Sequence, residues 1–343
     1  MADKNIKREQ HGNSFKQAYI ETHIQTLLEN FQSEDAQGEV IKELEAARYE
    51  VFCLIITQLQ KFNIQAVFQY LPNLSYLTLT YGAKHVGMEY ERPLFGMKMS
   101  DATTFKECLR TTTSLTYLSL PGNLIDDDLI GILIKGLMLN KTITQLDLSH
   151  NKIGQSGARK ISKYLLQSQI LTHLNLGDNC INYEGSRYLC QALKVNKSLV
   201  NLNLKLNRID DKAGQKMCID LRVKESCLET LNLAANLLGN MFCESLSEYI
   251  TYNTSIKRLD ISSNQIDESN AETLKGSLLA NDRIVQFDVK RNGFSPNTEE
   301  EVKEIVMKNF LKSQNIRYTR LGANVGRVVG TNEEDQAMVS ASL

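Results

Sequence analysis

Residues 142–169 read TITQLDLSHNKIGQSGARKISKYLLQSQ, and this stretch decides the fold. Leu146 and Leu148 alternate with polar residues, as in a strand that buries one face, because successive side chains of a strand point to opposite sides. Asn151 follows at the point where the chain must turn inward. Residues 158–165 then carry apolar side chains at spacings of three and four, which predicts an amphipathic helix. The stretch therefore predicts one strand–turn–helix unit whose apolar face is too small to fold alone.

The unit returns along most of the chain, and its clearest mark is an asparagine at separations of 28, 28, 28, 29, 28 and 28 residues. The asparagine ladder consists of Asn123, Asn151, Asn179, Asn207, Asn236, Asn264 and Asn292. Each rung closes the phrase Leu-x-x-Leu-x-Leu-x-x-Asn, with Ile, Val or Phe in some of the later units. This period is typical of a leucine-rich-repeat solenoid of the α/β class, here with about eight repeats. We expect each ladder amide to bond backbone groups of the turn that no strand pairing satisfies.

The phrases LDLSHNKIGQSGARKIS and LNLGDNCINYEGSRYL, in helix-bearing repeats of 28 and 29 residues, resemble the ribonuclease-inhibitor-type leucine-rich-repeat family. The resemblance covers about residues 62–312. It implies a curved right-handed arc, with parallel strands on the concave face and helices on the convex face, and an activity that is usually binding. Within that family the chain is similar to the ciliary branch, which includes subunits of the dynein regulatory complex.

The repeats predict three regions: a helical N-terminal segment and cap over 1–61, a repeat domain over 62–312, and an extended or disordered tail over 313–343. Helices are expected over 14–31 and 38–60, and a last one from Pro296 to about Leu311. Leu74 and Leu115 are 41 residues apart, 13 more than the period, so the surplus falls in the loop 80–99. A loop of this length is commonly functional, and the alternative is a cap over the first strand.

Composition narrows the class of partner. The net charge is −1, so no global electrostatic case exists for nucleic acid or an anionic membrane. No apolar run approaches the ~20 residues of a membrane span, and the polar start lacks the apolar region of a secretory signal. The seven cysteines are odd in number and form no CxxC, as expected of free thiols in a reducing compartment. We therefore expect a cytoplasmic protein without cofactor, metal or small-molecule substrate.

The candidate site is the polar side of the strands. One column of outward positions reads Tyr117, Gln145, His173, Asn201, Thr230, Arg258 and Gln286, and the next reads Ser119, Asp147, Asn175, Asn203, Asn232, Asp260 and Asp288. The functional interpretation is a partner groove, joined by Tyr90 and Arg92 of the loop. Tyr117, His173 and Arg258 would then be the anchors, since large amphipathic and arginine side chains dominate hot spots. The alternative is a solvated face on which short polar side chains tolerate curvature.

Two acidic clusters have simple structural explanations. Asp126–Asp128 and Asp210–Asp211 follow the turn and are expected to cap the next helices. A calcium site would need ligands at alternating spacing and a closing Glu, and the sequence has no such arrangement.

No HExxH, GxSxG or GxxxxGK[ST] motif occurs, so no residue is assigned a catalytic role. We expect a non-enzymatic scaffold or adaptor that binds other proteins in a ciliary, axonemal assembly, with coiled-coil or doublet-microtubule-associated subunits as partners. The main alternative is a small-GTPase-activating protein of the Ran type. An inhibitor of a secreted enzyme would need a strongly acidic face, against which the net charge of −1 argues.

Overall fold

The computed structural model describes residues 14–31, 36–60, 62–82, 95–222, 226–314, 317–321 and 325–329. The chain divides into two compact units, Met1–Asn207 and Arg208–Leu343, and the boundary falls inside the repeat array. Each unit alternates strands with helices. Among the described residues, no helix is both long and apolar enough to cross a membrane.

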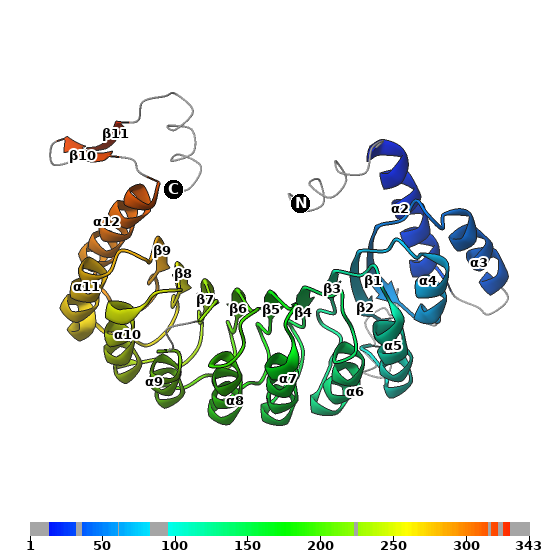
Figure 1. Ribbon diagram of the computed structural model, residues 1–343, viewed down its shortest axis with the longest axis horizontal. Helices are drawn as coiled ribbons and strands as arrows, with labels where there is room; N and C mark the ends of the chain where they lie inside the picture. Colours follow the sequence, from blue (N-terminus) through cyan, green and yellow to red (C-terminus); the bar gives the residue numbers. More distant parts are fainter. Residues whose placement is uncertain are drawn as a thin grey trace, which may run out of the picture. The chain divides into compact units, whose positions relative to one another are not determined.

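The first unit pairs its strands β1 to β6 in sequence order, and every pair is parallel (Figure 1). Helices α4 to α8 lie together on one side of the strands, whereas α2 lies along the outer edge of β1 (Figure 1). The elements are α2 (Ser14–Glu29), α3 (Gln37–Ala46), β1 (Cys53–Leu59), α4 (Ile64–Tyr70), β2 (Tyr76–Tyr81), α5 (Met99–Thr111), β3 (Tyr117–Ser119), α6 (Asp127–Leu137), β4 (Gln145–Asp147), α7 (Gln155–Gln167), β5 (His173–Asn175), α8 (Tyr183–Leu193) and β6 (Asn201–Asn203).

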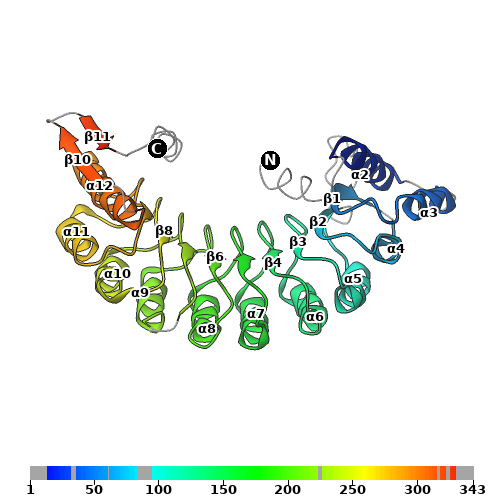
Figure 2. The ribbon, with the colours of Figure 1, turned by 45° about the horizontal axis from the view of Figure 1, so that its top comes forward.

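The second unit continues the alternation, with β7, β8 and β9 in parallel (Figure 2). Its last helix is followed by an antiparallel pair of strands, which lies in the region expected to be an extended tail. The elements are α9 (Asp211–Asp220), β7 (Thr230–Asn232), α10 (Asn240–Tyr252), β8 (Arg258–Asp260), the 3-10 helix η3 (Glu268–Asn270), α11 (Ala271–Ala280), β9 (Gln286–Asp288), α12 (Pro296–Ser313), β10 (Arg317–Leu321) and β11 (Val325–Val329).

The core of each unit is the interior between strands and helices, as the repeat predicts. The apolar strand positions of the seven complete repeats are buried, as are the helical positions that form the predicted stripe. The exception is Phe287 of β9, which is only half-buried. Each fully buried leucine stabilises the folded unit by roughly 1.5–3 kcal/mol relative to exposure.

The prediction of a helix over 38–60 is wrong beyond residue 46. Helix α3 ends at Ala46, and Cys53–Leu59 forms β1, an additional strand at the start of the sheet. Its burial alternates at first, so Leu54 and Ile56 are buried while Ile55 is half-buried on the other side. A short apolar run does not by itself distinguish a strand from a helix.

The asparagine ladder bonds neighbouring repeats together, as predicted. Asn179 Nδ2 donates to the Leu148 and Leu176 carbonyls, both at 3.0 Å, and its Oδ1 accepts the Ile153 N–H at 3.0 Å. The residue before each rung has a positive φ, from 52° to 65°. That left-handed residue turns the chain, and the amide then satisfies the backbone groups that the turn leaves without a strand partner.

A second ladder at the ends of the helices was missed by the sequence analysis. Its rungs are Asn140, Asn196, Asn253, Asn281 and Asn309, again at multiples of about one repeat. Asn196 is typical: its Nδ2 donates to the Leu165 carbonyl at 2.7 Å, and its Oδ1 accepts the N–H groups of Ser198 and Leu199. The signal was an Asn five residues before β4, β6, β8 and β9, on the other side of the repeat from the first ladder.

The acidic clusters cap helices, as predicted, but each also caps the helix of the following repeat. Asp210 accepts the Ala213 N–H within its own helix. Asp211 Oδ1 instead accepts the N–H groups of Gly239 and Phe242, both at 2.8 Å, at the start of α10. Gly239 is the N-cap of that helix and has no side chain that could accept these N–H groups. Asp127 caps the Gly154 start of α7 in the same way. A carboxylate from one repeat therefore supplies the cap of the next.

Replacing Asp211 by alanine is expected to lower the free energy of unfolding by about 1–2 kcal/mol, because α10 loses its only side-chain cap and half-buried N–H groups lose their acceptor. Chemical denaturation followed by circular dichroism measures this loss. Asp211→Asn keeps one acceptor oxygen and should lose less. An alanine variant as stable as the parent would show that the cap contributes nothing.

The loop 80–99 is closed at its base. Gly82 and Phe95 form an antiparallel bridge, and the Gly96 N–H donates to the Tyr81 carbonyl at 3.0 Å. Gly96 has a φ of +75°, and a Cβ there would lie 2.7 Å from the Asn123 carbonyl oxygen, so a glycine is required. Tyr81 is buried in the core, and burial raises the pKa of its hydroxyl. Residues 83–94, with the predicted partner-binding Tyr90 and Arg92, lie outside the described residues.

Candidate functional site

The strand register brings the predicted columns together within each unit. In the first unit, Tyr117, Gln145, His173 and Asn201 are consecutive partners across β3 to β6. In the second unit, Arg258 pairs with Gln286 and Asp260 pairs with Asp288. We call these two rows of outward side chains the strand surface of the first unit and the strand surface of the second unit. The sequence analysis missed one member, Tyr76, which pairs with Tyr117.

The aromatic end of the first strand surface is a stack of two tyrosines. The rings of Tyr76 and Tyr117 lie 4.0 Å apart between centroids, with an angle of 4° between their planes. Both side chains are half-buried, and burial together with a hydrogen bond to Tyr76 raises the pKa of Tyr117. The Tyr117 phenol is therefore neutral at physiological pH. The two rings present a rigid, amphipathic surface of the kind that recurs at protein interfaces.

His173 continues the row as a neutral side chain. Partial burial lowers its pKa below the usual value, and Thr172 Oγ1 lies 2.8 Å from its Nδ1. Its neighbour Asn201 has a side-chain oxygen that is buried and has no hydrogen-bond partner among the described residues. A buried acceptor without a donor costs free energy.

The second column has a structural role that the sequence analysis did not predict. Asp147 Oδ1 accepts the N–H of Ser149 at 2.8 Å, two residues further on. The same bond is made by Asn175, Asn203, Asn232, Asp260 and Asp288. Because Asp and Asn side chains form such turns readily, this explains their recurrence at the ends of the strands. Ser119 is buried, so the column does not extend to β3 as an outward surface.

The second strand surface is more exposed and more basic. Arg258 and Gln286 are exposed, and an Arg258 guanidinium nitrogen lies 3.3 Å from Thr230 Oγ1. The adjacent Lys257 is paired with Glu229 at 2.6 Å. At the strand-end turns of the first unit, His150 Nδ1 lies 2.8 Å from Asp178 Oδ2, and both side chains are exposed. Neither surface has the convergent acid, base and nucleophile of a catalytic site.

Metal binding finds no support in the described part of the chain, where no three His, Cys, Asp or Glu side chains are grouped to hold an ion. The cysteines in this part are free thiols. Cys108, Cys190, Cys218 and Cys243 are buried, and Cys180 and Cys227 are exposed.

Four stretches of the chain match the family model described as Leucine Rich repeat, at residues 139–162, 167–190, 195–218 and 252–269. The fold is a leucine-rich-repeat solenoid. Its repeats are similar to part of dynein regulatory complex subunit 5 of Chlamydomonas reinhardtii, with 37% identity over 128 residues. That match covers 36% of this chain and 33% of the relative, so the chain spans about a third of the length of the curated relative it matches.

Two solved structures are also similar to this leucine-rich-repeat chain. The leiomodin-1 actin-binding site 2 has a TM-score of 0.32 and 13% identity, covering 64% of this chain and 94% of its own. An internalin from Listeria monocytogenes has a TM-score of 0.36 and 16% identity, covering 82% and 91%. At scores this low, neither similarity bears on function.

Proposed function

We propose that this leucine-rich-repeat protein is a non-enzymatic scaffold that docks other proteins on its strand surfaces, as a subunit of a ciliary, axonemal assembly like the dynein regulatory complex. The repeats support protein–protein interaction, and the similarity to a dynein regulatory complex subunit supports the kind of assembly. Coiled-coil or doublet-microtubule-associated subunits are the proposed partners.

The observation that carries the proposal is the row from Tyr76 to Asn201. It joins a stacked aromatic pair, a neutral histidine and a buried acceptor without a donor, all on one side of adjacent parallel strands. Half-buried aromatic side chains lose little conformational entropy when a partner covers them. The second column contributes less to partner binding, because its side-chain oxygens already accept hydrogen bonds from backbone N–H groups of the turns.

The partner is identified first by cross-linking mass spectrometry on cilium extracts that contain the native protein. We expect cross-links from lysines beside the strand surfaces, such as Lys205, Lys257 and Lys290, to proteins of the dynein regulatory complex or of the doublet. Cross-links to a small GTPase instead would favour the Ran-type alternative, for which acceleration of GTP hydrolysis is the assay.

Replacing both Tyr117 and His173 by alanine is expected to weaken binding of the cross-linked partner at least about tenfold, because each anchor of a hot spot contributes more than ~1 kcal/mol. The matched control is Lys135→Ala with Lys163→Ala, two exposed positions on helices α6 and α7. Arg258→Ala tests the second strand surface separately. An unchanged affinity in a double variant that keeps its circular dichroism spectrum would rule out the first strand surface as the docking site.

A further inference from the structure

β9 is the last strand of the parallel sheet in the second unit, and no strand among the described residues pairs with its outer edge. The Gln286 N–H donates to the Lys257 carbonyl at 3.1 Å, and the Asp288 carbonyl accepts the Ile261 N–H at 2.9 Å, so both residues turn their backbone groups toward β8. Because successive residues of a strand turn these groups to opposite sides, Phe287 directs its N–H and carbonyl to the other edge. Within the described residues, no hydrogen bond is formed by either group.

The first strand of the other unit shows how this chain covers an edge. Glu21 of α2 accepts the N–H groups of Phe52 and Cys53 at 3.1 and 2.9 Å, and Glu29 accepts the Thr57 N–H at 2.7 Å. Carboxylates of a helix therefore occupy the outer donors along β1. No described side chain does the same for Phe287. An edge strand left in this way is a template for a further strand.

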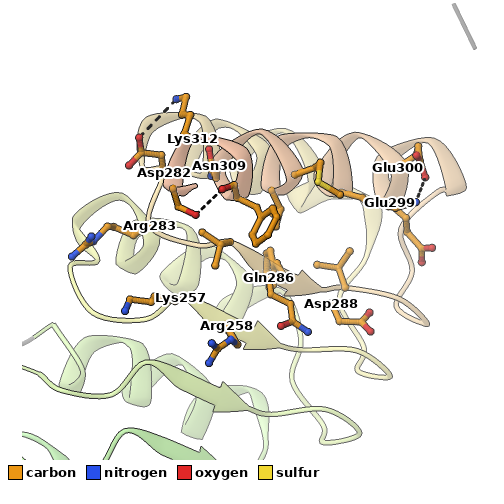
Figure 3. A pocket seen from close by; sticks show the side chains of 18 of the residues that line it. Lys257, Arg258, Asp282, Arg283, Gln286, Asp288, Glu299, Glu300, Asn309 and Lys312 are labelled. Atoms are coloured by element: carbon orange, nitrogen blue, oxygen red, sulfur yellow. Dashed lines mark hydrogen bonds and ion pairs between the residues drawn. The ribbon is translucent and has the colours of Figure 1, made fainter. Parts of the chain in front are cut away.

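The open edge borders a groove of about 1230 Å³ between β9 and α12 (Figure 3). Its apolar lining includes Phe287 from the strand and Val306, Met307 and Phe310 from the helix. Phe287 is half-buried, whereas the leucine at the same position of every strand from β3 to β8 is buried. The groove therefore combines free backbone groups with apolar surface that a bound segment would cover.

The two ends of the groove differ in net charge. Lys257, Arg258, Arg283 and Lys312 lie with Asp282 at the end where β9 begins, which is net positive (Figure 3). Asp288, Glu299 and Glu300 lie with Lys290 and Lys303 at the end where β9 finishes, which is net negative. Lys257 is already paired with Glu229. The described contacts of Arg283 are to the Thr254 carbonyl, at 3.1 and 3.3 Å, and not to a carboxylate. A bound segment whose charges run in the opposite order therefore matches the groove in only one of the two strand directions.

We infer that this groove binds an extended segment of a partner protein, which adds to β9 as a further parallel strand. The segment would carry acidic residues at its N-terminal end over Arg258 and Arg283, alternating apolar residues over Phe287, and basic residues at its C-terminal end near Glu299. Backbone bonds to Phe287 supply affinity, and the alternate side chains supply specificity. The groove shares Arg258, Gln286 and Asp288 with the second strand surface, but it does not depend on the proposed docking at Tyr117 and His173.

The test is a fluorescence-anisotropy titration of the full chain with a labelled synthetic peptide, Asp-Glu-Val-Thr-Val-Thr-Val-Lys-Arg. We expect saturable binding that weakens about tenfold for the charge-reversed peptide Lys-Arg-Val-Thr-Val-Thr-Val-Asp-Glu. Methylating the backbone nitrogens of alternate residues, which removes donors to the edge, should weaken it about tenfold as well. In the protein, Arg283→Glu should weaken binding about fivefold, while Lys141→Glu, an exposed control in the first unit, should not.

Hydrogen exchange provides a second measurement. The peptide should slow exchange of the Phe287 and Val289 amides and leave those of α7 unchanged. The inference is overturned if neither peptide binds, if both methylated registers bind as tightly as the parent, or if the reversed peptide binds equally well. Self-association of the chain that Arg283→Glu abolishes would assign the groove to a second copy and overturn the partner segment. None of these outcomes bears on the strand surface of the first unit, whose test uses other residues.

Discussion

Replacing Phe105 by alanine is expected to lower the free energy of unfolding by about 3–5 kcal/mol. Phe105 lies in α5 and is fully buried. Its ring meets that of Phe68 edge to face, with centroids 5.6 Å apart and planes at 87°. The substitution removes apolar surface, leaves a cavity and breaks an aromatic contact that contributes beyond its area.

Urea denaturation followed by circular dichroism measures this loss. Phe15→Ala is the matched control, because Phe15 lies in α2 with 90% of its surface exposed and should change stability by less than about 0.5 kcal/mol. Phe105→Leu, which keeps most of the volume, should fall between the two. If Phe105→Ala were as mild as Phe15→Ala, α5 would not be packed against the strands as described.

The burial of Phe105 illustrates what the period reveals. A repeat of 28 residues places each strand leucine and each helical apolar residue in the same register, so the core follows once one repeat is interpreted. Outside the repeats, secondary structure has to be predicted from local sequence patterns. Residues 51–59 are apolar at several spacings, and only the structure shows that Leu54 and Ile56 alternate as in a strand.

The positions of the candidate site residues on the strands could be predicted from the sequence, whereas their roles could be predicted less well. Alternation along each strand places Tyr117, Gln145 and His173 in one row, because parallel neighbours with equal repeats pair in register. Tyr76 was missed because the long loop after β2 interrupts the spacing. The Asp and Asn side chains of the second column form turn hydrogen bonds with residues close in sequence, but the same residue types also suit a binding surface. Composition alone therefore does not distinguish these two roles.

Contacts between repeats are harder to predict from the sequence. Asp211 caps a helix whose N-cap, Gly239, lies 28 residues later, and among the described residues no strand pairs with the outer edge of β9. Neither feature can be predicted from a sequence pattern within one repeat. Both follow from stacking, in which each repeat completes the hydrogen bonds of its neighbour.

Replacing Asn179 by alanine is expected to cost about 1–3 kcal/mol, near the upper end of that range. Its side chain is buried and donates to the Leu148, Leu176 and Gly177 carbonyls while accepting the Ile153 N–H. Alanine leaves these groups buried without a partner. The loss should appear as a lower midpoint in urea with an unchanged slope.

Asn292 is the matched control, since it makes the corresponding bonds in the second unit. Its Nδ2 donates to the Ile261 and Val289 carbonyls at 3.0 and 2.8 Å, and its Oδ1 accepts the Ile266 N–H at 3.3 Å. Asn292 is only half-buried, so water can replace the lost amide and Asn292→Ala should cost about 1 kcal/mol or less. Equal losses at the two rungs would mean that the bonds themselves, and not their burial, set the contribution of the ladder. A larger loss at Asn179 would show that desolvation makes this asparagine indispensable in the interior of the array.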